Sequence, residues 1–373
     1  MPRAAQDRGA AACLNGARLA EWLYEAGIGE ARTVLVEDGR IVEAAVEPDD
    51  VGPRVGEVAR ARLVDRHTGR IRLDGGVEAQ LQGPAGVPEG GALTVAITRE
   101  ALAEPGRVKL PRAVLTDQPP QPGPDLLARL RGDPAETVSP PRRRPGPSSA
   151  GGADEGRPST SGTAEAGPRP SPGKRAPSPP VRMMTSHGPD LLEQAGWSEL
   201  LEEARTGDIA FVSGALRMWP TPAMTLFDVD GAGPLEPLAL RAAEAVAQAI
   251  RRHGVGGSIG VDFPTLPDKA ARLRVAAALD AALPPPFERT AVNGFGFLQI
   301  VRPRPRPSLP ERLRADPAGA AVRALLRRLE REPPGAPGLH RVPPAQLARL
   351  QARPDWLAEL TRRTGVVHRF EVS

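Results

Sequence analysis

Three acidic residues in two short apolar segments have the types and spacing that could hold a metal ion. In residues 224–230, the alternation of side chains along a β-strand puts Asp228 and Asp230 on one face, with apolar residues on the other. In residues 258–263, Asp262 shares its face with a serine and a glycine, and these small neighbours leave room for a ligand. The two segments together predict an acidic surface on a β-sheet.

The acids could form a metal site if the two strands are parallel neighbours. Strands about 4.8 Å apart would bring the carboxylates of Asp228 and Asp262 together near the C-terminal strand ends, where open α/β sheets bind ligands. Like charges so close repel each other unless a cation lies between them. Mg²⁺ uses one or two carboxylates, waters and substrate phosphate, and it promotes attack on phosphodiesters. The residues alone leave open that both acids cap a following helix or turn.

The chain around the acids alternates between strand and helix, which predicts an α/β core. Apolar residues recur at helical spacing in residues 236–253, and a glycine follows as a stop signal. A strand, this helix and a second strand form a βαβ unit with parallel strands and a right-handed crossover. The predicted strands are residues 210–218, 224–230, 258–263 and 290–302, and the predicted helices are residues 191–204, 236–253 and 268–283.

Both flanks of this core have their own patterns. Residues 31–46 predict a β-hairpin, and several short strands separated by Gly and Pro turns follow between residues 56 and 114. That spacing is typical of a small antiparallel barrel of the size of an oligonucleotide-binding fold. Residues 118–182 are rich in Pro and Gly and poor in apolar residues, so we expect a disordered linker. Beyond residue 308 we expect helices at 320–332 and 344–364 and a strand at 366–372.

Composition restricts the class of protein. The 49 Lys and Arg residues outnumber the 45 Asp and Glu residues only slightly, so charge does not decide whether the partner is a polyanion. The single cysteine, Cys13, excludes an internal disulfide framework and a multi-cysteine zinc site within one chain, which favours the cytoplasm. No apolar run is long enough for a membrane span, and the N-terminus has no secretory signal pattern.

One phosphatase class offers a rival interpretation of the first acidic strand. The sequence from Phe227 to Gly231 resembles the nucleophile motif of haloacid-dehalogenase-type phosphatases, in which the first Asp attacks phosphate and the second protonates the leaving group. That family places a Thr or similar residue after the first Gly, where this chain has Ala232. Asp262 also follows too soon for that core. We keep this class as a minor alternative.

Three consecutive segments match, in order and spacing, sequence blocks of one enzyme family. Residues 224–230 resemble a strand ending in Asp-(Ile/Val)-Asn, and residues 256–263 resemble a Gly-Gly-x-Ile-x-Ile-Asp-Phe block. Residues 293–309 resemble a Phe-Gly-Leu-Leu-Glu-Met block that continues through alternating arginines to Pro-Ser-Leu. These blocks are those of the catalytic domain of the ribonuclease E/G family, and the chain resembles a short member of it.

The resemblance implies a multidomain fold of mixed α+β and α/β class. It implies a barrel inserted into an RNase H-like subdomain, followed by a catalytic domain and a small terminal domain. The implied boundaries are residues 1–50 for the N-terminal part of the RNase H-like subdomain, 55–117 for the oligonucleotide-binding (OB-fold) barrel, 118–182 for the disordered linker, 183–310 for the α/β DNase I-like catalytic domain with the remainder of the RNase H-like subdomain at its start, and 311–373 for the small α/β C-terminal domain.

The resemblance also implies an activity, that of a Mg²⁺-dependent endoribonuclease that cleaves single-stranded RNA. Asp228 and Asp262 would be the metal ligands, and Asp230 a ligand or a group that positions water. RNA phosphates would contact Arg302 and Arg304, just beyond a strand on the catalytic side, and Lys269, at the start of a helix. A solvated Pro-Arg tether and a plain surface lysine are the alternatives for these three cations.

Several departures from the family keep a second function open. Asp230 stands where the family has Asn, and Gly294 where it has Arg. The 5′-monophosphate sensor and the two-cysteine zinc link between subunits have no counterpart, so a homodimer would form without zinc. Residues 51–180 contain no Phe, Trp or Tyr to stack on bases. A non-catalytic RNA-binding relative of the family is therefore the alternative.

Overall fold

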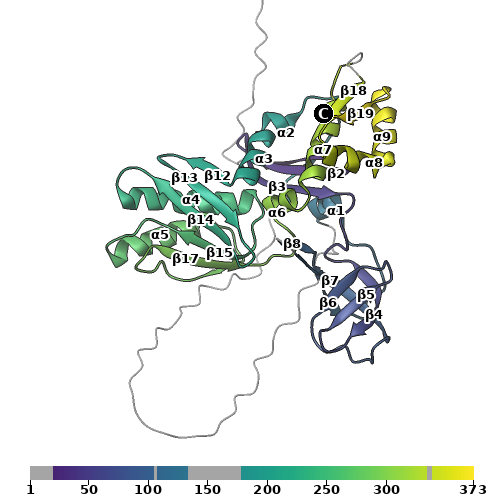
Figure 1. The fold of residues 1–373 in the computed structure, drawn as a ribbon. Helices are drawn as coiled ribbons and strands as arrows, with labels where there is room; N and C mark the ends of the chain where they lie inside the picture. The colour runs from purple at the N-terminus through teal and green to yellow at the C-terminus, as the bar shows by residue number, and fades with distance from the viewer. Residues whose placement is uncertain (1–19, 105–106, 133–177, 334–337) are drawn as a thin grey trace, which may run out of the picture.

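The computed structural model describes residues 20–104, 107–132, 178–333 and 338–373. It is a mixed α/β multidomain structure. Figure 1 shows a six-stranded sheet with its helices on one side of the molecule, and a β-barrel and the C-terminal helices on the other. None of the helices in the described part of the chain is long and apolar enough to cross a membrane.

A four-stranded sheet is built from two distant parts of the chain. Its strand order is β11 (Val181–Met184), β1 (Ala20–Ala26), β2 (Glu30–Glu37) and β3 (Arg40–Pro48). The predicted hairpin is confirmed, since β2 and β3 pair antiparallel around a turn at residues 38 and 39. β11 pairs parallel with β1 although the whole barrel lies between them in sequence. The barrel is therefore an insertion between two strands of one sheet.

The inserted unit is a closed five-stranded barrel, compatible with the oligonucleotide-binding fold expected from the strand spacing. Its inward side chains are apolar and form one core, to which every strand contributes. Because the barrel closes on itself, none of its strands has a free edge. The strands run in the order β10 (Arg112–Leu115), β6 (Glu78–Leu81), β5 (Arg70–Leu73), β4 (Val58–Asp65) and β7 (Ala92–Arg99), and a side hairpin comprises β8 (Leu102–Glu104) and β9 (Arg107–Lys109).

The predicted disordered linker is wrong at both of its ends. Residues 118–132 are folded and contain the helix α1 (Leu126–Arg131), and residues 181 and 182 belong to β11. Asp125 caps α1, and Arg129 contacts the carboxylate of Glu47 at 2.5 Å. One specific ion pair and a buried leucine thus outweigh a composition poor in apolar residues. Residues 133–177 of the predicted linker lie outside the described residues.

The six-stranded sheet contains the acidic segments. Its order is β12 (Asp208–Phe211), β13 (Gly214–Pro220), β14 (Thr225–Gly231), β15 (Gly257–Asp262), β17 (Phe297–Arg302) and β16 (Glu288–Arg289). The predicted βαβ unit is present, since α4 (Leu235–Arg252) connects β14 to its parallel neighbour β15. The predicted strand at 210–218 is wrong, because Ser213, with φ of 75°, turns the chain into the β12–β13 hairpin.

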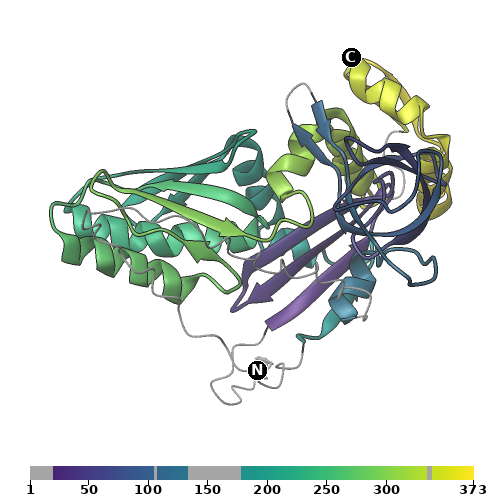
Figure 2. The same cartoon turned by 90° about the horizontal axis from the view of Figure 1, so that it is seen from below.

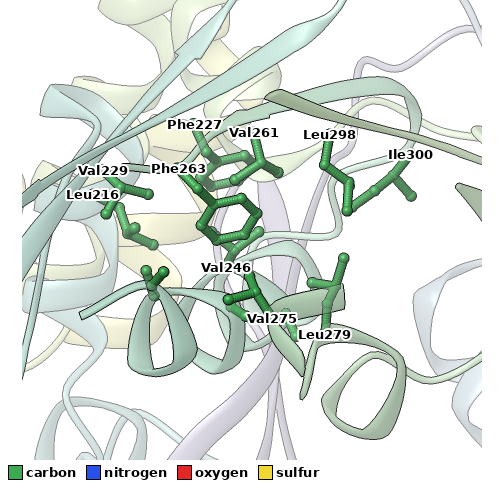
Figure 3. Close-up of a cluster of buried hydrophobic side chains, with 14 of the residues drawn as sticks. Leu216, Phe227, Val229, Val246, Val261, Phe263, Val275, Leu279, Leu298 and Ile300 are labelled. Carbon is green, nitrogen blue, oxygen red and sulfur yellow. The ribbon is translucent and has the colours of Figure 1, made fainter. Parts of the chain in front are cut away.

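Both long helices of this unit lie on the same face of the sheet. α4 and α5 (Lys269–Ala282) pack on Phe227, Val261 and Ile300, which lie among the apolar side chains of neighbouring strands (Figure 3). Figure 2 shows the two helices together below the sheet. The opposite face carries Asp228 and Asp262 and is open to solvent.

Two predicted helices are each divided in two, and one of them belongs to the largely helical C-terminal part. Residues 344–364 form two helices because Pro354 cannot donate a backbone hydrogen bond within a helix. Residues 191–204 are interrupted by Gly196, which adopts a left-handed conformation. The elements are α2 (Leu191–Gln194), α3 (Trp197–Thr206), α6 (Leu309–Ala315), α7 (Pro317–Leu329), β18 (Leu339–Val342), α8 (Pro344–Gln351), α9 (Pro354–Thr364) and β19 (Arg369–Val372).

Buried ion pairs join the C-terminal helices to the four-stranded sheet. Glu30 at the start of β2 accepts from the Nε of Arg323 at 3.1 Å and is also bonded to Arg327, both on α7. Glu25 on β1 pairs in the same way with Arg32 at 2.5 Å and with Arg331. A charge inside a protein is tolerated only when it is paired, so each group here depends on the others.

We predict that Glu30→Gln destabilises the protein strongly, because it leaves the buried Arg327 without its carboxylate and leaves Arg323 with only Asp316, 3.6 Å away. Removing one partner of a buried pair costs about 3–5 kcal/mol. The loss is measured as a lower urea midpoint. Glu202→Gln, which removes an exposed pair with Arg205, is the matched control and should change stability by less than about 1 kcal/mol. Equal midpoints for the two variants would contradict the prediction.

Candidate functional site

Asp228 and Asp262 lie side by side, as the strand order required. They are Cα partners in the parallel pairing of β14 and β15, and both side chains are exposed on the open face. Neighbouring strands are about 4.8 Å apart, so the two carboxylates project from adjacent positions. Asp262 is the last residue of β15, which places the pair at the carboxyl end of that strand.

The pair belongs to a longer row of side chains across the open face. The register joins Asp208 of β12 to Arg217 of β13, and Arg217 to Asp228. On the other side, Asp262 is in register with Phe297 of β17. The acid pair is thus flanked by a guanidinium group on one side and an aromatic ring on the other.

Arg217 is a candidate site residue that the sequence did not reveal. Its Nε lies 3.5 Å from a carboxylate oxygen of Asp230, and the two side chains are 70% and 60% exposed. An ion pair this exposed contributes little to stability, so a phosphate could replace the carboxylate. The sequence does not predict this position, because it depends on the register of β13 and β14 around the turn at residues 221–224. The prolines at residues 220 and 222, which lie at the turn, are the sequence signal for it.

The small residue beside Asp262 does not leave an open space. A Cβ placed on Gly260 would lie 2.7 Å from Cζ of Phe297 and 2.8 Å from Cδ2 of Leu226, with the sulfur of Met224 at 3.0 Å. Side chains of the neighbouring strands therefore cover the glycine. The expectation that a ligand approaches over this position is wrong, and the available surface lies at the acids themselves.

The donor set suits Mg²⁺ better than a cation that needs a protein cage. Within the described residues, no group of three or more His, Cys, Asp and Glu side chains could hold a metal ion. Mg²⁺ is commonly bound by one or two carboxylates, with waters and substrate phosphates completing its shell. The exposed pair Asp228 and Asp262 fits that requirement, while Asp230 is engaged by Arg217.

The predicted RNA-contacting arginines do not lie with the acid pair. Arg302 is in register with Gly257, at the opposite end of β15 from Asp262, and alternation puts its side chain on the helix face. Burial lowers the pKa of the Arg302 guanidinium below its usual value, and the carboxylate of Glu43 opposes this effect. The expectation that Arg302 lies on the side of the acid pair is wrong. Arg302 is five positions after Phe297, which is in register with Asp262, and an odd number of positions along a strand leads to the opposite face.

Arg304 and Lys269 have different environments. Arg304 is bonded to Glu311 of α6, and its side chain lies against the backbone of Gly256. It is therefore a packed residue that joins two elements, neither a solvated tether nor a free cation. Lys269 is exposed at the start of α5, the helix that Asp268 caps. No contact ties this lysine to the acid pair in the described part of the chain.

A tight turn next to Asp262 is the other feature that the sequence did not predict. The side-chain oxygen of Asn293 accepts from the backbone N–H of Phe295 at 2.9 Å and of Phe297 at 3.0 Å. The carbonyl of Gly296 accepts from the N–H of Phe263 at 3.2 Å, directly after Asp262. The turn is thus fixed to the end of the strand that carries the acid.

The chain matches no protein-family model, and no curated protein matches it. The likeness to ribonuclease E/G therefore depends on the three sequence blocks alone.

We predict that Gly296→Ala disrupts the turn while Gly294→Ala does not. Gly296 has a φ of +97°, and an added Cβ would lie 2.1 Å from the carbonyl oxygen of Phe263, whereas a Cβ on Gly294 meets nothing within 4 Å. Backbone strain of this kind costs about 1–3 kcal/mol, and the clash adds to it. Thermal unfolding measures the difference. Equal melting temperatures in the two variants would show that the turn is built otherwise.

Proposed function

We propose that this chain is a cytoplasmic Mg²⁺-dependent endoribonuclease of the ribonuclease E/G type that cleaves single-stranded RNA. The observation that carries the proposal is the pairing of Asp228 with Asp262, in register and exposed, on the open face of the six-stranded sheet. Under this proposal the four-stranded sheet is the RNase H-like subdomain and the six-stranded sheet is the DNase I-like catalytic domain.

Each residue at the acid pair has a distinct role in this proposal. Asp228 and Asp262 hold the ion, and Asp230 orients the attacking water through its carboxylate. When bound, Mg²⁺ supplies positive charge to the phosphodiester under attack and makes a water more acidic. Arg217, adjacent to Asp228, contacts a phosphate of the strand, which provides the charge that the family's Arg would provide at Gly294.

The barrel offers a second contact for the polyanion. On its outer surface, Arg62 of β4 is in register with Arg72 of β5, and both are exposed. Like charges placed opposite each other on a sheet are destabilising. Of these two arginines, Arg72 forms an ion pair with Glu78, and Arg62 does not. An RNA backbone would remove this repulsion. Binding through phosphate contacts is salt-sensitive and independent of base identity, which suits a barrel without aromatic residues.

A non-catalytic RNA-binding relative is the second candidate. It is favoured by the ion pair between Arg217 and Asp230, which engages one of the three acids in the free protein. The two candidates share the RNA contacts and differ only in whether the acid pair supports cleavage.

We predict Mg²⁺-dependent cleavage of a labelled single-stranded RNA that disappears on addition of EDTA. Asp228→Asn and Asp262→Asn should each lower the rate at least about 100-fold, because each removes one of two metal ligands and leaves the fold unchanged. Glu244→Gln on the exposed surface of α4 is the control and should retain full activity. Equal cleavage by wild type and both Asp variants would indicate a contaminating nuclease. RNA binding without cleavage would favour the non-catalytic relative.

We predict that Arg217→Gln weakens RNA binding and makes it less sensitive to salt. Loss of one phosphate contact should reduce the slope of log Kd against log salt concentration by about 0.7 for a single strand. Filter binding at several salt concentrations measures the slope. Arg205→Gln removes an arginine that is similarly exposed and also ion-paired, but on α3, and should leave the slope unchanged. Identical slopes for the two variants would remove Arg217 from the proposed site.

A further inference from the structure

Phe295 has the largest exposed fraction, 83%, of the large apolar side chains in the described part of the chain. Single apolar residues are common on protein surfaces, so exposure alone does not indicate a site. Its support and its position distinguish this phenylalanine from the others.

The backbone of Phe295 is held from both sides. Its N–H donates to the side chain of Asn293, and its carbonyl accepts from the hydroxyl of Thr265 at 3.3 Å. Thr265 lies three residues after Asp262, the last residue of β15. This hydrogen bond therefore ties Phe295 to the segment that follows the acid. A side chain on a fixed backbone loses little conformational freedom when it binds a ligand.

Phe295 lies at the end of the sheet where the acid pair lies. Phe297 is in register with Asp262, and Phe295 lies two residues before Phe297, in the turn whose Gly296 carbonyl accepts from the N–H of Phe263 at 3.2 Å. The turn that carries Phe295 is therefore next to the end of the strand that carries Asp262.

A second exposed aromatic residue on this sheet already makes a cation–π contact within the protein. Trp219 is 60% exposed, but the guanidinium of Arg314 lies over its ring at 4.9 Å. In the ranges that the structure describes, neither a cation nor another ring is stacked on Phe295. Its π face is free to receive a planar ligand.

We propose that Phe295 is a stacking platform for a nucleobase of single-stranded RNA, next to the phosphodiester at Asp228 and Asp262. The inference rests on the proposed function and names the part of the substrate that the ring contacts. Bases of single strands stack on aromatic side chains whatever their identity, because every base has a π face. The loop before β17 supplies the stacking contact that the barrel lacks.

The test compares two single-stranded RNAs of equal length, one intact and one with abasic positions. Affinities are measured by fluorescence anisotropy with Ca²⁺ in place of Mg²⁺, and the RNA is checked on a gel for integrity after each titration. Phe295→Ala should weaken binding of intact RNA by about 5- to 150-fold, the loss expected for one stacked base, and should not change binding of abasic RNA. Phe295→Trp should retain wild-type affinity. Val367→Ala, at another exposed apolar residue, is the control.

Several results would overturn the stacking role. One is unchanged binding of intact RNA by Phe295→Ala. Another is an equal loss for intact and abasic RNA. A third is a change of oligomeric state in Phe295→Ala without a change in RNA affinity, which would assign the residue to contact with a second copy. Mg²⁺-dependent cleavage by the wild type is assayed in parallel. Cleavage with no effect of Phe295→Ala on binding rejects the platform and leaves the proposed function standing, whereas absence of both binding and cleavage rejects both.

Discussion

The location of α4 and α5 on a single face of the six-stranded sheet is the constraint from which the site follows. α4 contacts the sheet largely through small residues, among them Ala242 and Ala247, which are fully buried. Their size lets the helix pack closely against the apolar face of the strands. Because side chains alternate along a strand, burial of one face sends every second residue to the other. The helices thus leave the opposite surface, with Asp228 and Asp262, to water and ligands.

The acid pair could be predicted from sequence because it depends on short-range rules. Alternation fixed the faces of Asp228, Asp230 and Asp262, and the helical segment between the two strands indicated that they run parallel. Pairing of neighbouring strands then determined the rest. The barrel was predictable for the same reason, since short strands and glycine turns report on local structure. Its insertion between β3 and β11 was expected only from the resemblance.

Contacts between distant residues could not be predicted. Arg302, Arg304 and Arg306 follow one another in a regular Pro-Arg pattern, which in sequence is indistinguishable from a solvated tether. In the structure their environments differ because each meets another element. Arg306, for example, pairs with Glu100 next to the barrel, about 200 residues earlier in the chain. Arg217 could not be placed for a related reason, since its position beside Asp228 depends on the register of β13 and β14 around the turn at residues 221–224. Composition records which charges exist and says nothing of where they meet.

The pairing of Glu30 with α7 has a consequence for any fragment that lacks this helix. Its partners Arg323 and Arg327 are 293 and 297 residues further along the chain. In such a fragment the four-stranded sheet would keep a carboxylate without these counter-charges, and an unpaired charge is costly to bury. The sheet is therefore not a unit that could be excised with its charges balanced.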